Sequence, residues 1–316
     1  MDEPRGGVLY LVGTPIGNRE DLSPRSARVL QQLDRLACED TRHSAVLLGP
    51  LGIRARPISF HQHNRRQRLP KLLGWLAAGE SVGLICDAGL PGINDPGEEL
   101  VAAAWAAGHP VVCIPGPTAV TTALVSSGLP SGRFVFEGFL PATRSRRRRA
   151  LVALAREERT LVFYEAPHRL VVFLEDVLEL WGDRPLRVAR ELTKYHEEQV
   201  GPTAAAALAH FRGQTPRGEC CVVVAGAPAF SDASPAGDEL LASLRALIET
   251  EGLSPSRAAR ALAVRTGQSR QAIYALLHGA GGLGADQGDD NTGEPDGNPA
   301  GGVEPGTSAG MKGSGV

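Results

Sequence analysis

Four carboxylates that directly follow short apolar segments are the residues in this sequence best suited to acid–base chemistry. They are Asp87, Glu39, Asp40 and Glu165. A carboxylate in a cleft that is partly shielded from water can accept the proton of a substrate hydroxyl. We take all four as candidate catalytic residues, and the sequence alone does not rank them.

Three loops rich in glycine and proline could bring their backbone close to a ligand. They are 13–18 (GTPIGN), 87–97 (DAGLPGINDPG) and 115–117 (PGP). In the second loop, Asp95 and Pro96 suit the N-cap and the first position of a helix. A strand, a glycine-containing loop and a helix N-terminus in succession place a small ligand at the carboxyl edge of a sheet. The first loop is not a dinucleotide-binding G-x-G-x-x-G, and no G-x-x-x-x-G-K-[ST] phosphate loop occurs in the chain.

Arginines are concentrated in the segment 144–149. They are Arg144, Arg146, Arg147, Arg148 and Arg149. So many positive charges repel one another unless an anion relieves them, and a guanidinium group holds a phosphate through its planar fork. We therefore favour a surface that binds a polyanion over a merely solvated helix face. Because the segment comes just after 137–141 (EGFLP), we expect it to lie near the ligand cleft. More arginines occur at 257–270, where the pattern predicts a helix-turn-helix that could bind nucleic acid or serve in packing.

Histidines and cysteines give no metal-binding pattern. His61 and His63 could suggest one, but no third ligand lies at a useful spacing, so we expect a polar loop and no metal. The five cysteines include no C-x-x-C pair and lie in or beside apolar runs. We therefore expect buried free thiols.

The composition is typical of a soluble, cytoplasmic protein. A chain of 316 residues is long enough to bury a sizeable core, and 42% of its residues are hydrophobic and 22% are charged. No apolar run reaches the roughly 18 residues that span a bilayer, and the N-terminus lacks a signal-peptide pattern. The formal net charge of −2 is unevenly distributed, because residues 281–316 carry six acidic side chains and one lysine. We expect no membrane association.

Alternating strands and helices must position the candidate groups. Apolar runs at 8–12, 35–38, 55–60, 82–86 and 111–114, with helices between them, predict an α/β domain with a largely parallel sheet. Strands at 133–137, 160–164, 186–190 and 219–225, with helices at 145–156, 168–181 and 203–211, predict a second α/β domain with a mixed sheet. The expected organisation is a domain at 1–117, a domain at 118–228, a linker at 229–237, a helix-turn-helix-like module at 238–280 and a disordered acidic tail at 281–316.

Seven motifs occur in the order and at the spacing of a known family. They read LVGTPIGN (11–18), EDTRH (39–43), DAGLPGINDPG (87–97), PGP (115–117), EGFLP (137–141), FYE with HR (163–169) and ARELTK (189–194). On these residues the chain resembles the small-subunit rRNA methyltransferases of the tetrapyrrole methylase superfamily. The resemblance runs from about Gly7 to Ala225 and includes the helix-turn-helix segment, but not the extreme N-terminus or the acidic tail.

The resemblance implies two α/β domains of tetrapyrrole-methylase type with S-adenosyl-L-methionine in the cleft between them. It also implies methylation of the ribose 2′-oxygen of one cytidine in the decoding centre of 16S rRNA, with the 30S subunit as partner and a homodimer as the assembly. The implied cofactor-binding residues are Thr14, Pro15, Ile16, Gly17, Asp87, Ala88, Gly89, Asp95, Pro96, Gly97, Pro115, Gly116, Pro117, Tyr164 and Glu165. Arg42 and Lys194 join the five clustered arginines as candidate RNA contacts.

Three positions depart from the family pattern. The family loop usually reads SDAGTP, and here Cys86 and Leu90 replace the serine and the threonine. We expect Cys86 to lie inside a strand, whereas Leu90 removes a hydroxyl near the expected cofactor. Arg217 stands where the family usually has a lysine, which keeps the charge but changes its geometry. A methyltransferase of a tetrapyrrole precursor and a non-catalytic RNA-binding relative remain alternative functions.

Overall fold

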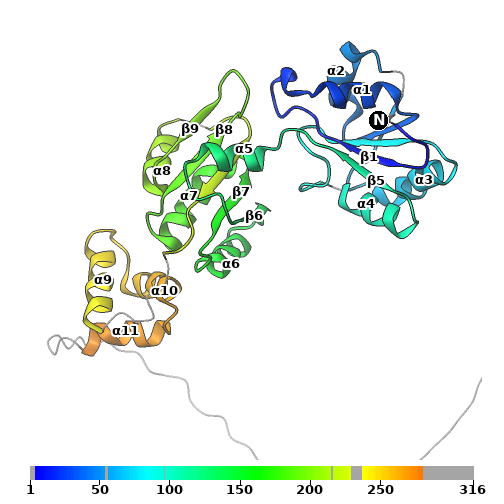
Figure 1. The fold of residues 1–316 in the computed structure, drawn as a ribbon. Helices are drawn as coiled ribbons and strands as arrows, with labels where there is room; N and C mark the ends of the chain where they lie inside the picture. Colours follow the sequence, from blue (N-terminus) through cyan, green and yellow to red (C-terminus); the bar gives the residue numbers. More distant parts are fainter. Residues whose placement is uncertain (1–3, 54–55, 96, 215, 229–236, 280–316) are drawn as a thin grey trace, which may run out of the picture.

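The computed structural model describes residues 4–53, 56–95, 97–214, 216–228 and 237–279. Two sheets with their helices are followed by a small group of helices, and in Figure 1 these parts lie one after another along the molecule. The predicted α/β fold with a C-terminal helical segment is confirmed.

The first sheet contains parallel strands in the order β3-β2-β4-β1-β5. Its elements are β1 (Leu9–Val12), α1 (Pro24–Gln32), β2 (Arg35–Cys38), α2 (Thr41–Leu48), β3 (Pro57–Ser59), α3 (Arg65–Ala77), β4 (Val82–Ile85), α4 (Gly97–Ala106) and β5 (Val111–Ile114). The hydroxyl of Ser23 accepts a hydrogen bond from the amide of Ser26 and so caps α1, whose first residue is a proline. The parallel sheet confirms the prediction for this half.

Helices cover both faces of the first sheet. Val29 of α1 and Leu48 of α2 pack on one face, while Leu72 of α3 and Leu100 of α4 pack on the other. The neighbouring strands β1 and β4 therefore lead into helices on opposite faces, α1 and α4. Such a switch point opens a crevice at the carboxyl ends of the two strands. The glycine–proline loops after β1 and β4 lie at this crevice.

The second sheet has the order β6-β7-β10-β8-β9. The elements of this half are α5 (Ala119–Ser126), β6 (Phe134–Phe139), α6 (Arg144–Leu154), β7 (Thr160–Glu165), α7 (Pro167–Trp181), β8 (Leu186–Arg190), β9 (Glu198–Val200), α8 (Ala204–Gly213) and β10 (Cys220–Val224). The sheet is mixed, as predicted, because only β6 and β7 run parallel. The sequence did not predict β9, whose three residues include only one apolar side chain.

Opposite faces of the second sheet carry different helices. Helices α6, α7 and α8 cover one face, where Phe163 and Phe173 lie fully buried. The other face packs against α5 through Val120 and Leu124, and against Ile16 from the loop after β1. The apolar core on this face therefore contains a residue from the first half of the chain, which ties the two sheets together.

Helices α9 (Gly237–Glu249), α10 (Pro255–Thr266) and α11 (Arg270–Gly279) form the C-terminal group. They pack around Leu244, Ala258 and Ile273. Gly267 ends α10 in a left-handed conformation with φ of +72°, which gives the predicted turn between α10 and α11. The group contacts α7, where Arg257 pairs with Glu179 at 2.9 Å.

The predicted limits of the domains remain a prediction. They are supported by α5, the first helix after residue 117, which packs against β7 and β10 of the second sheet. Most of the predicted linker, and the whole predicted tail at 281–316, lie outside the described residues. Four cysteines are buried free thiols as expected, but Cys113 is exposed because β5 is an edge strand.

Candidate functional site

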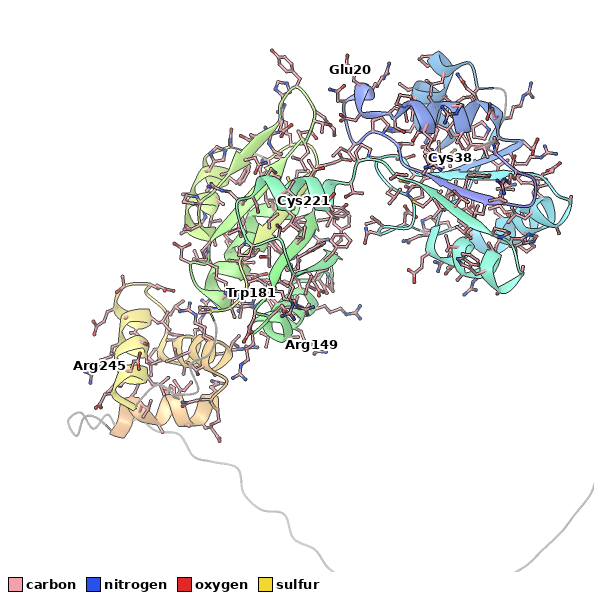
Figure 2. The ribbon with its side chains drawn as sticks, in the orientation of Figure 1. Glu20, Cys38, Arg149, Trp181, Cys221 and Arg245 are labelled. Atoms are coloured by element: carbon pink, nitrogen blue, oxygen red, sulfur yellow. The ribbon has the colours of Figure 1, made fainter. Side chains whose placement is uncertain are left out.

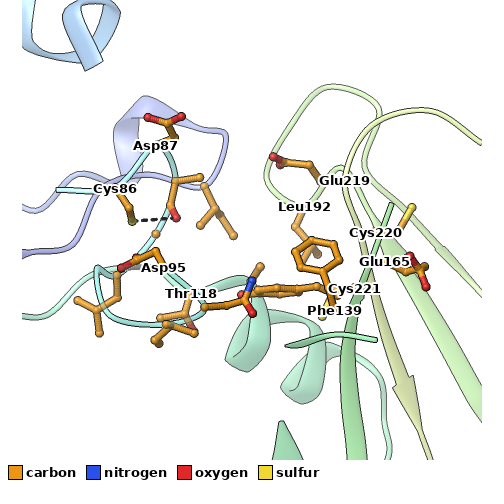
Figure 3. A pocket seen from close by; sticks show the side chains of 18 of the residues that line it. Cys86, Asp87, Asp95, Thr118, Phe139, Glu165, Leu192, Glu219, Cys220 and Cys221 are labelled. Carbon is orange, nitrogen blue, oxygen red and sulfur yellow. Dashed lines mark hydrogen bonds between the residues drawn. The ribbon is translucent and has the colours of Figure 1, made fainter. Parts of the chain in front are cut away.

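A cavity of about 440 Å³ lies where the loops of the first sheet meet the second sheet. Its lining is largely apolar with a few carboxylates, which is typical of a site for a small organic ligand. One side in Figure 3 carries Cys86, Asp87 and Asp95, and the other carries Phe139, Leu192, Glu219, Cys220 and Glu165. We call this space the first cavity.

Contacts between backbone groups hold the loops of the first side together. The amide and the hydroxyl of Thr14 donate to the carbonyl of Gly89 at 2.8 and 3.2 Å. Gly13 and Gly116 approach so closely that a Cβ added to Gly13 would lie 2.6 Å from the Cα of Gly116. The glycines of the predicted loops therefore let three loops pack against one another.

Asp95 closes the loop after β4. Its Oδ1 accepts hydrogen bonds from the amides of Gly92 and Gly97 at 2.8 and 2.7 Å. Its Oδ2 is buried and has no hydrogen-bond partner among the described residues. Burial raises the pKa of this carboxyl. A buried acceptor without a protein donor, at the wall of a cavity, suits a ligand amine or hydroxyl.

Asp87 and Glu39 lie at neighbouring strand ends and both line the first cavity. Asp87 Oδ1 accepts a hydrogen bond from the amide of Asp40 at 3.1 Å, which joins the ends of β2 and β4. Burial raises the pKa of Glu39, and the negative charges of Asp87 and Asp95 raise it further. This carboxyl therefore takes up a proton more readily than an ordinary glutamate.

Glu165 and Tyr164 contribute to the opposite side from β7. The Glu165 side chain is fully buried, accepts from the amide of Ala166 at 2.8 Å and pairs with Arg169 at 3.0 Å. Burial nevertheless raises the pKa of Glu165. The ring of Tyr164 lies 5.5 Å from that of Phe139, centroid to centroid, so this side also offers aromatic surface.

The two sides also meet directly at Gly17. A Cβ there would lie 2.7 Å from Thr193 Oγ1 and 2.9 Å from the carbonyl oxygen of Leu192. The amide of Asn18 donates to Thr193 Oγ1 at 3.0 Å. Only a glycine allows this close approach of the β8–β9 loop to the loop after β1.

The predicted cofactor residues divide into groups by position. Those that line the first cavity are Ile16, Asp87, Ala88, Gly89, Asp95, Tyr164 and Glu165. Pro15 and Gly17 line a neighbouring cavity, whereas Thr14, Gly97, Pro115, Gly116 and Pro117 line neither. Pro96 lies outside the described residues. Instead of the PGP motif itself, the two residues that follow it, Thr118 and Ala119, line the first cavity.

Several lining residues were not predicted from the sequence. They are Ile93, Asn94, Thr118, Ala119, Phe139, Ala166, Pro167, Ala189, Leu192, Glu219, Cys220 and Cys221, whereas Leu90 was expected near the ligand and does line the cavity. Most are apolar, so their side chains gave no chemical signal, although many adjoin a motif residue. The expectation that Cys86 lies inside a strand is wrong, because β4 ends at Ile85. Cys86 lines the cavity, and its thiol donates to the carbonyl of Ala88 at 3.2 Å.

Asp40 does not fit the predicted catalytic role. It caps α2, where Oδ1 accepts from the amide of Arg42 at 2.8 Å and the carboxylate pairs with the Arg42 guanidinium at 2.8 Å. These contacts hold the pKa of Asp40 well below its usual range. Asp40 is therefore a poor proton acceptor, and it lines neither cavity.

The arginine cluster on α6 is largely paired within the protein. Arg147 is only 3% exposed and pairs with the buried Asp176 at 2.8 Å, so the prediction that Arg147 contacts RNA is wrong. Arg148 pairs with Asp176 and Glu179, and Arg144 with Asp176. The anions that relieve the predicted repulsion are therefore carboxylates of α7.

Two arginines of the cluster stay free to meet a partner. Arg146 and Arg149 are exposed and make no ion pair with any residue that the structure describes. In Figure 2, Arg149 lies near the C-terminal helices and away from the first sheet. No arginine of the cluster lines the first cavity. The expected position beside the cleft is wrong, because α6 packs on the far face of the second sheet.

The described part of the chain has neither a metal-binding cluster nor a helix that could span a membrane. No group of three or more His, Cys, Asp or Glu side chains there could hold a metal ion. None of the helices described is both long and apolar enough to cross a membrane.

Comparisons with known proteins give consistent results. A family model described as Tetrapyrrole (Corrin/Porphyrin) Methylases matches residues 8–209. The chain is 49% identical over 276 residues to the ribosomal RNA small subunit methyltransferase I of Synechocystis sp., with 85% of this chain and 97% of the relative covered. Identity to the protein of the same name in Escherichia coli O157:H7 is 44% over 272 residues, covering 85% and 93%.

A solved structure shares the fold. It is a cobalt precorrin-4 methyltransferase of cobalamin biosynthesis, with a TM-score of 0.54, 18% identity, and coverage of 71% of this chain and 97% of that one. At this identity, the match shows likeness of fold.

Proposed function

Because the chain belongs to the tetrapyrrole methylase family and, within it, to the ribosomal RNA small subunit methyltransferases I, we propose that it methylates small-subunit rRNA with S-adenosyl-L-methionine. The specific reaction proposed is methylation of the ribose 2′-oxygen of a cytidine in the decoding centre of 16S rRNA. The observation that carries the proposal is the first cavity, which residues of the family motifs line from both sheets.

The residues of the first cavity fit S-adenosyl-L-methionine. The unpartnered Oδ2 of Asp95 suits the amine or a ribose hydroxyl of this molecule. Phe139 and Tyr164 supply aromatic surface for an adenine ring. Leu90 lines the cavity without a hydroxyl, so contacts at this position are limited to its backbone and apolar side chain.

The chemistry requires alignment and proton removal. S-adenosyl-L-methionine supplies a methyl group on a positively charged sulfur, so the methyl group needs no further activation. The protein must hold the ribose hydroxyl in line with that group and accept its proton. Glu39 suits proton removal, because its pKa is raised and it lines the cavity beside Asp87. Asp87 would hold the cofactor. Glu165, which pairs with Arg169, would keep the wall of the cavity around Glu165 in place.

RNA contacts are proposed for the exposed cations. Arg146 and Arg149 remain available on α6, and Arg42 is largely exposed although it pairs with Asp40. Lys194 is held by Glu191 and Glu219 at 2.9 Å each, so it contributes to the shape of the site more than to its net charge. The 30S subunit is the proposed partner, a homodimer the proposed assembly, and the cytoplasm the proposed location.

Methyl transfer from tritium-labelled S-adenosyl-L-methionine tests the proposal. Purified protein should label 16S rRNA in 30S subunits from cells that lack this methyl group, and nuclease digestion should yield 2′-O-methylcytidine. Label on a precorrin substrate instead would support a tetrapyrrole methyltransferase. Binding of 30S subunits without transfer of label would support a non-catalytic RNA-binding protein.

A further inference from the structure

A second cavity, of about 260 Å³, adjoins the first one. The loop after β1, helix α2, the segment after β4, and Lys194 line it. The residues that line both cavities, and at which the two spaces meet, are Ile16, Cys86, Asp87, Ala88 and Glu219. Figure 3 shows Asp87 and Glu219 on opposite sides at the same end of the first cavity. A group bound in the second cavity would therefore reach the first one beside Asp87.

The walls of the second cavity combine apolar surface with an arginine and a histidine that have no acidic partner in the described part of the chain. Pro15, Ile16 and Leu47 provide the apolar surface. Arg19 and His43 line the same space, are exposed, and make no ion pair with any of the residues described. A guanidinium group and an imidazole N–H can both donate hydrogen bonds to a phosphate. Together with the apolar walls, they suit a ligand that has a flat or carbon-rich part and an anionic part.

The β8–β9 loop carries an exposed aromatic side chain one residue after Lys194. Tyr195 is 96% exposed and follows Lys194, a lining residue of the second cavity. The loop has an unusual backbone, because Glu191 and Thr193 have φ of 51° and 64°. Conformations of this kind are strained and persist where the surroundings hold them. The Thr193 amide donates to Glu197 Oε2 at 2.7 Å, which helps to hold the loop.

We propose that the second cavity takes the target nucleotide of a single-stranded RNA segment. A backbone phosphate would lie at Arg19 and His43, the ribose would point toward Asp87, and a neighbouring base would stack on Tyr195. Unpaired RNA is recognised in this way, with splayed bases stacked on aromatic side chains and phosphates held by cations. This inference rests on the proposed function and adds the position of the RNA relative to the methyl donor.

Steady-state kinetics of two variants, Arg19→Gln and Tyr195→Ala, test the inference. Each should raise the KM for 30S subunits, by about tenfold or more for loss of a stacked base. The dissociation constant for S-adenosyl-L-methionine, measured by calorimetry, should stay the same. Arg19→Gln should also reduce the dependence of RNA binding on log salt by about 0.7 to 0.9, the contribution of one phosphate.

Matched controls are available elsewhere on the surface. Trp105→Ala removes another exposed aromatic ring, on α4, and Arg245→Gln removes an exposed arginine on α9 (Figure 2). Neither should change the KM. If the wild type transfers methyl groups, the proposed function stands. If, in addition, Arg19→Gln and Tyr195→Ala leave the KM for 30S subunits and the salt dependence of RNA binding unchanged, the inference is overturned. If the wild type transfers no methyl group, anisotropy of a labelled single-stranded RNA with the same four variants decides the inference, and equal affinities reject it.

Discussion

At the scale of single residues, similar carboxylates have different roles because their surroundings differ. Asp40 is held ionised by the guanidinium of Arg42, whereas Glu39, its neighbour in the chain, has a raised pKa through burial. Asp95 Oδ1 accepts from the amides of Gly92 and Gly97, whereas its Oδ2 has no hydrogen-bond partner among the described residues. Only Glu39, Asp87, Asp95 and Glu165 among the carboxylates predicted as site residues line the first cavity, which narrows the choice of proton acceptor.

Asp87→Ala should abolish binding of S-adenosyl-L-methionine. The side chain lies where both cavities meet, and its Oδ1 also holds the end of β2 through the amide of Asp40. Calorimetry on purified protein measures the effect, with Asp87→Asn to separate loss of charge from loss of the hydrogen bond. Unchanged affinity in Asp87→Ala would reject the assignment of Asp87 to the cofactor.

Ionisation of Glu39 should determine how kcat falls at acidic pH. A proton acceptor works only when ionised, and the pKa of Glu39 is raised. The value of kcat should therefore fall on acidification at a higher pH than for an ordinary glutamate. Glu39→Gln should lower kcat by about a hundredfold or more and remove this fall at acidic pH. Glu20→Gln, at an exposed position (Figure 2), should leave kcat and its pH dependence unchanged. An unaltered pH dependence of kcat in Glu39→Gln would exclude Glu39 as the acceptor.

At the scale of elements, helix α6 shows that a run of one residue type can serve two purposes. Its arginines face in all directions around the helix, so those on the inner face meet α7 and those on the outer face meet solvent. Asp176 is completely buried and is contacted by Arg144, Arg147 and Arg148. The helix is therefore anchored by ion pairs as well as by Leu151 in the apolar core.

Arg147→Ala should destabilise the protein by about 3–5 kcal/mol, because it removes the most buried partner of a buried carboxylate. Arg149→Ala, two residues away on the outer face, should change stability by less than about 0.5 kcal/mol. Urea unfolding followed by circular dichroism measures both. The effect on RNA affinity should be the reverse. When both variants are compared under conditions in which they are fully folded, Arg149→Ala should bind RNA more weakly than Arg147→Ala. Equal stabilities of the two variants would show that the Asp176 pairs do not anchor α6.

At the scale of the whole molecule, the site exists only where the two sheets meet. Ile16 from the loop after β1 joins the apolar core on one face of the second sheet. Gly17 and Asn18 then contact Leu192 and Thr193 of the β8–β9 loop. One short segment of the first half therefore sets the position of both cavities.

Gly17→Ala should disturb this junction. Its Cβ would lie 2.5 Å from Lys194 Cγ and 2.9 Å from the carbonyl oxygen of Leu192, and a carbonyl cannot rotate away as a side chain can. Overpacking of this kind costs about 1–3 kcal/mol. The affinity for S-adenosyl-L-methionine should fall by about tenfold, as measured by calorimetry, because about 1.4 kcal/mol corresponds to that factor. Gly132→Ala, where a Cβ meets no atom within 4 Å, is the control. Equal affinities of the two variants would mean that the junction does not support the site.

The sequence by itself determined most of the local structure and the identity of the loops. Continuous apolar runs and capping residues such as Ser23 and Asp95 are local signals, so the strands, the helices and the three glycine–proline loops could be predicted. The motifs around Asp87 and Tyr164 also identified the family and part of the cavity wall. Short polar strands such as β9 carry no such signal.

The tertiary structure alone decided which of the candidate side chains share a space. Arg147 and Asp176 are far apart in the sequence, so no pattern in 144–149 could show that the cluster is neutralised from within. Likewise, Asp40 and Glu39 are neighbours in the chain with pKa values shifted in opposite directions. The pKa of Asp40 is lowered because Asp40 pairs with Arg42, whereas burial raises the pKa of Glu39. Charge, burial and cavity walls depend on contacts between distant segments, and these form only when the two sheets come together.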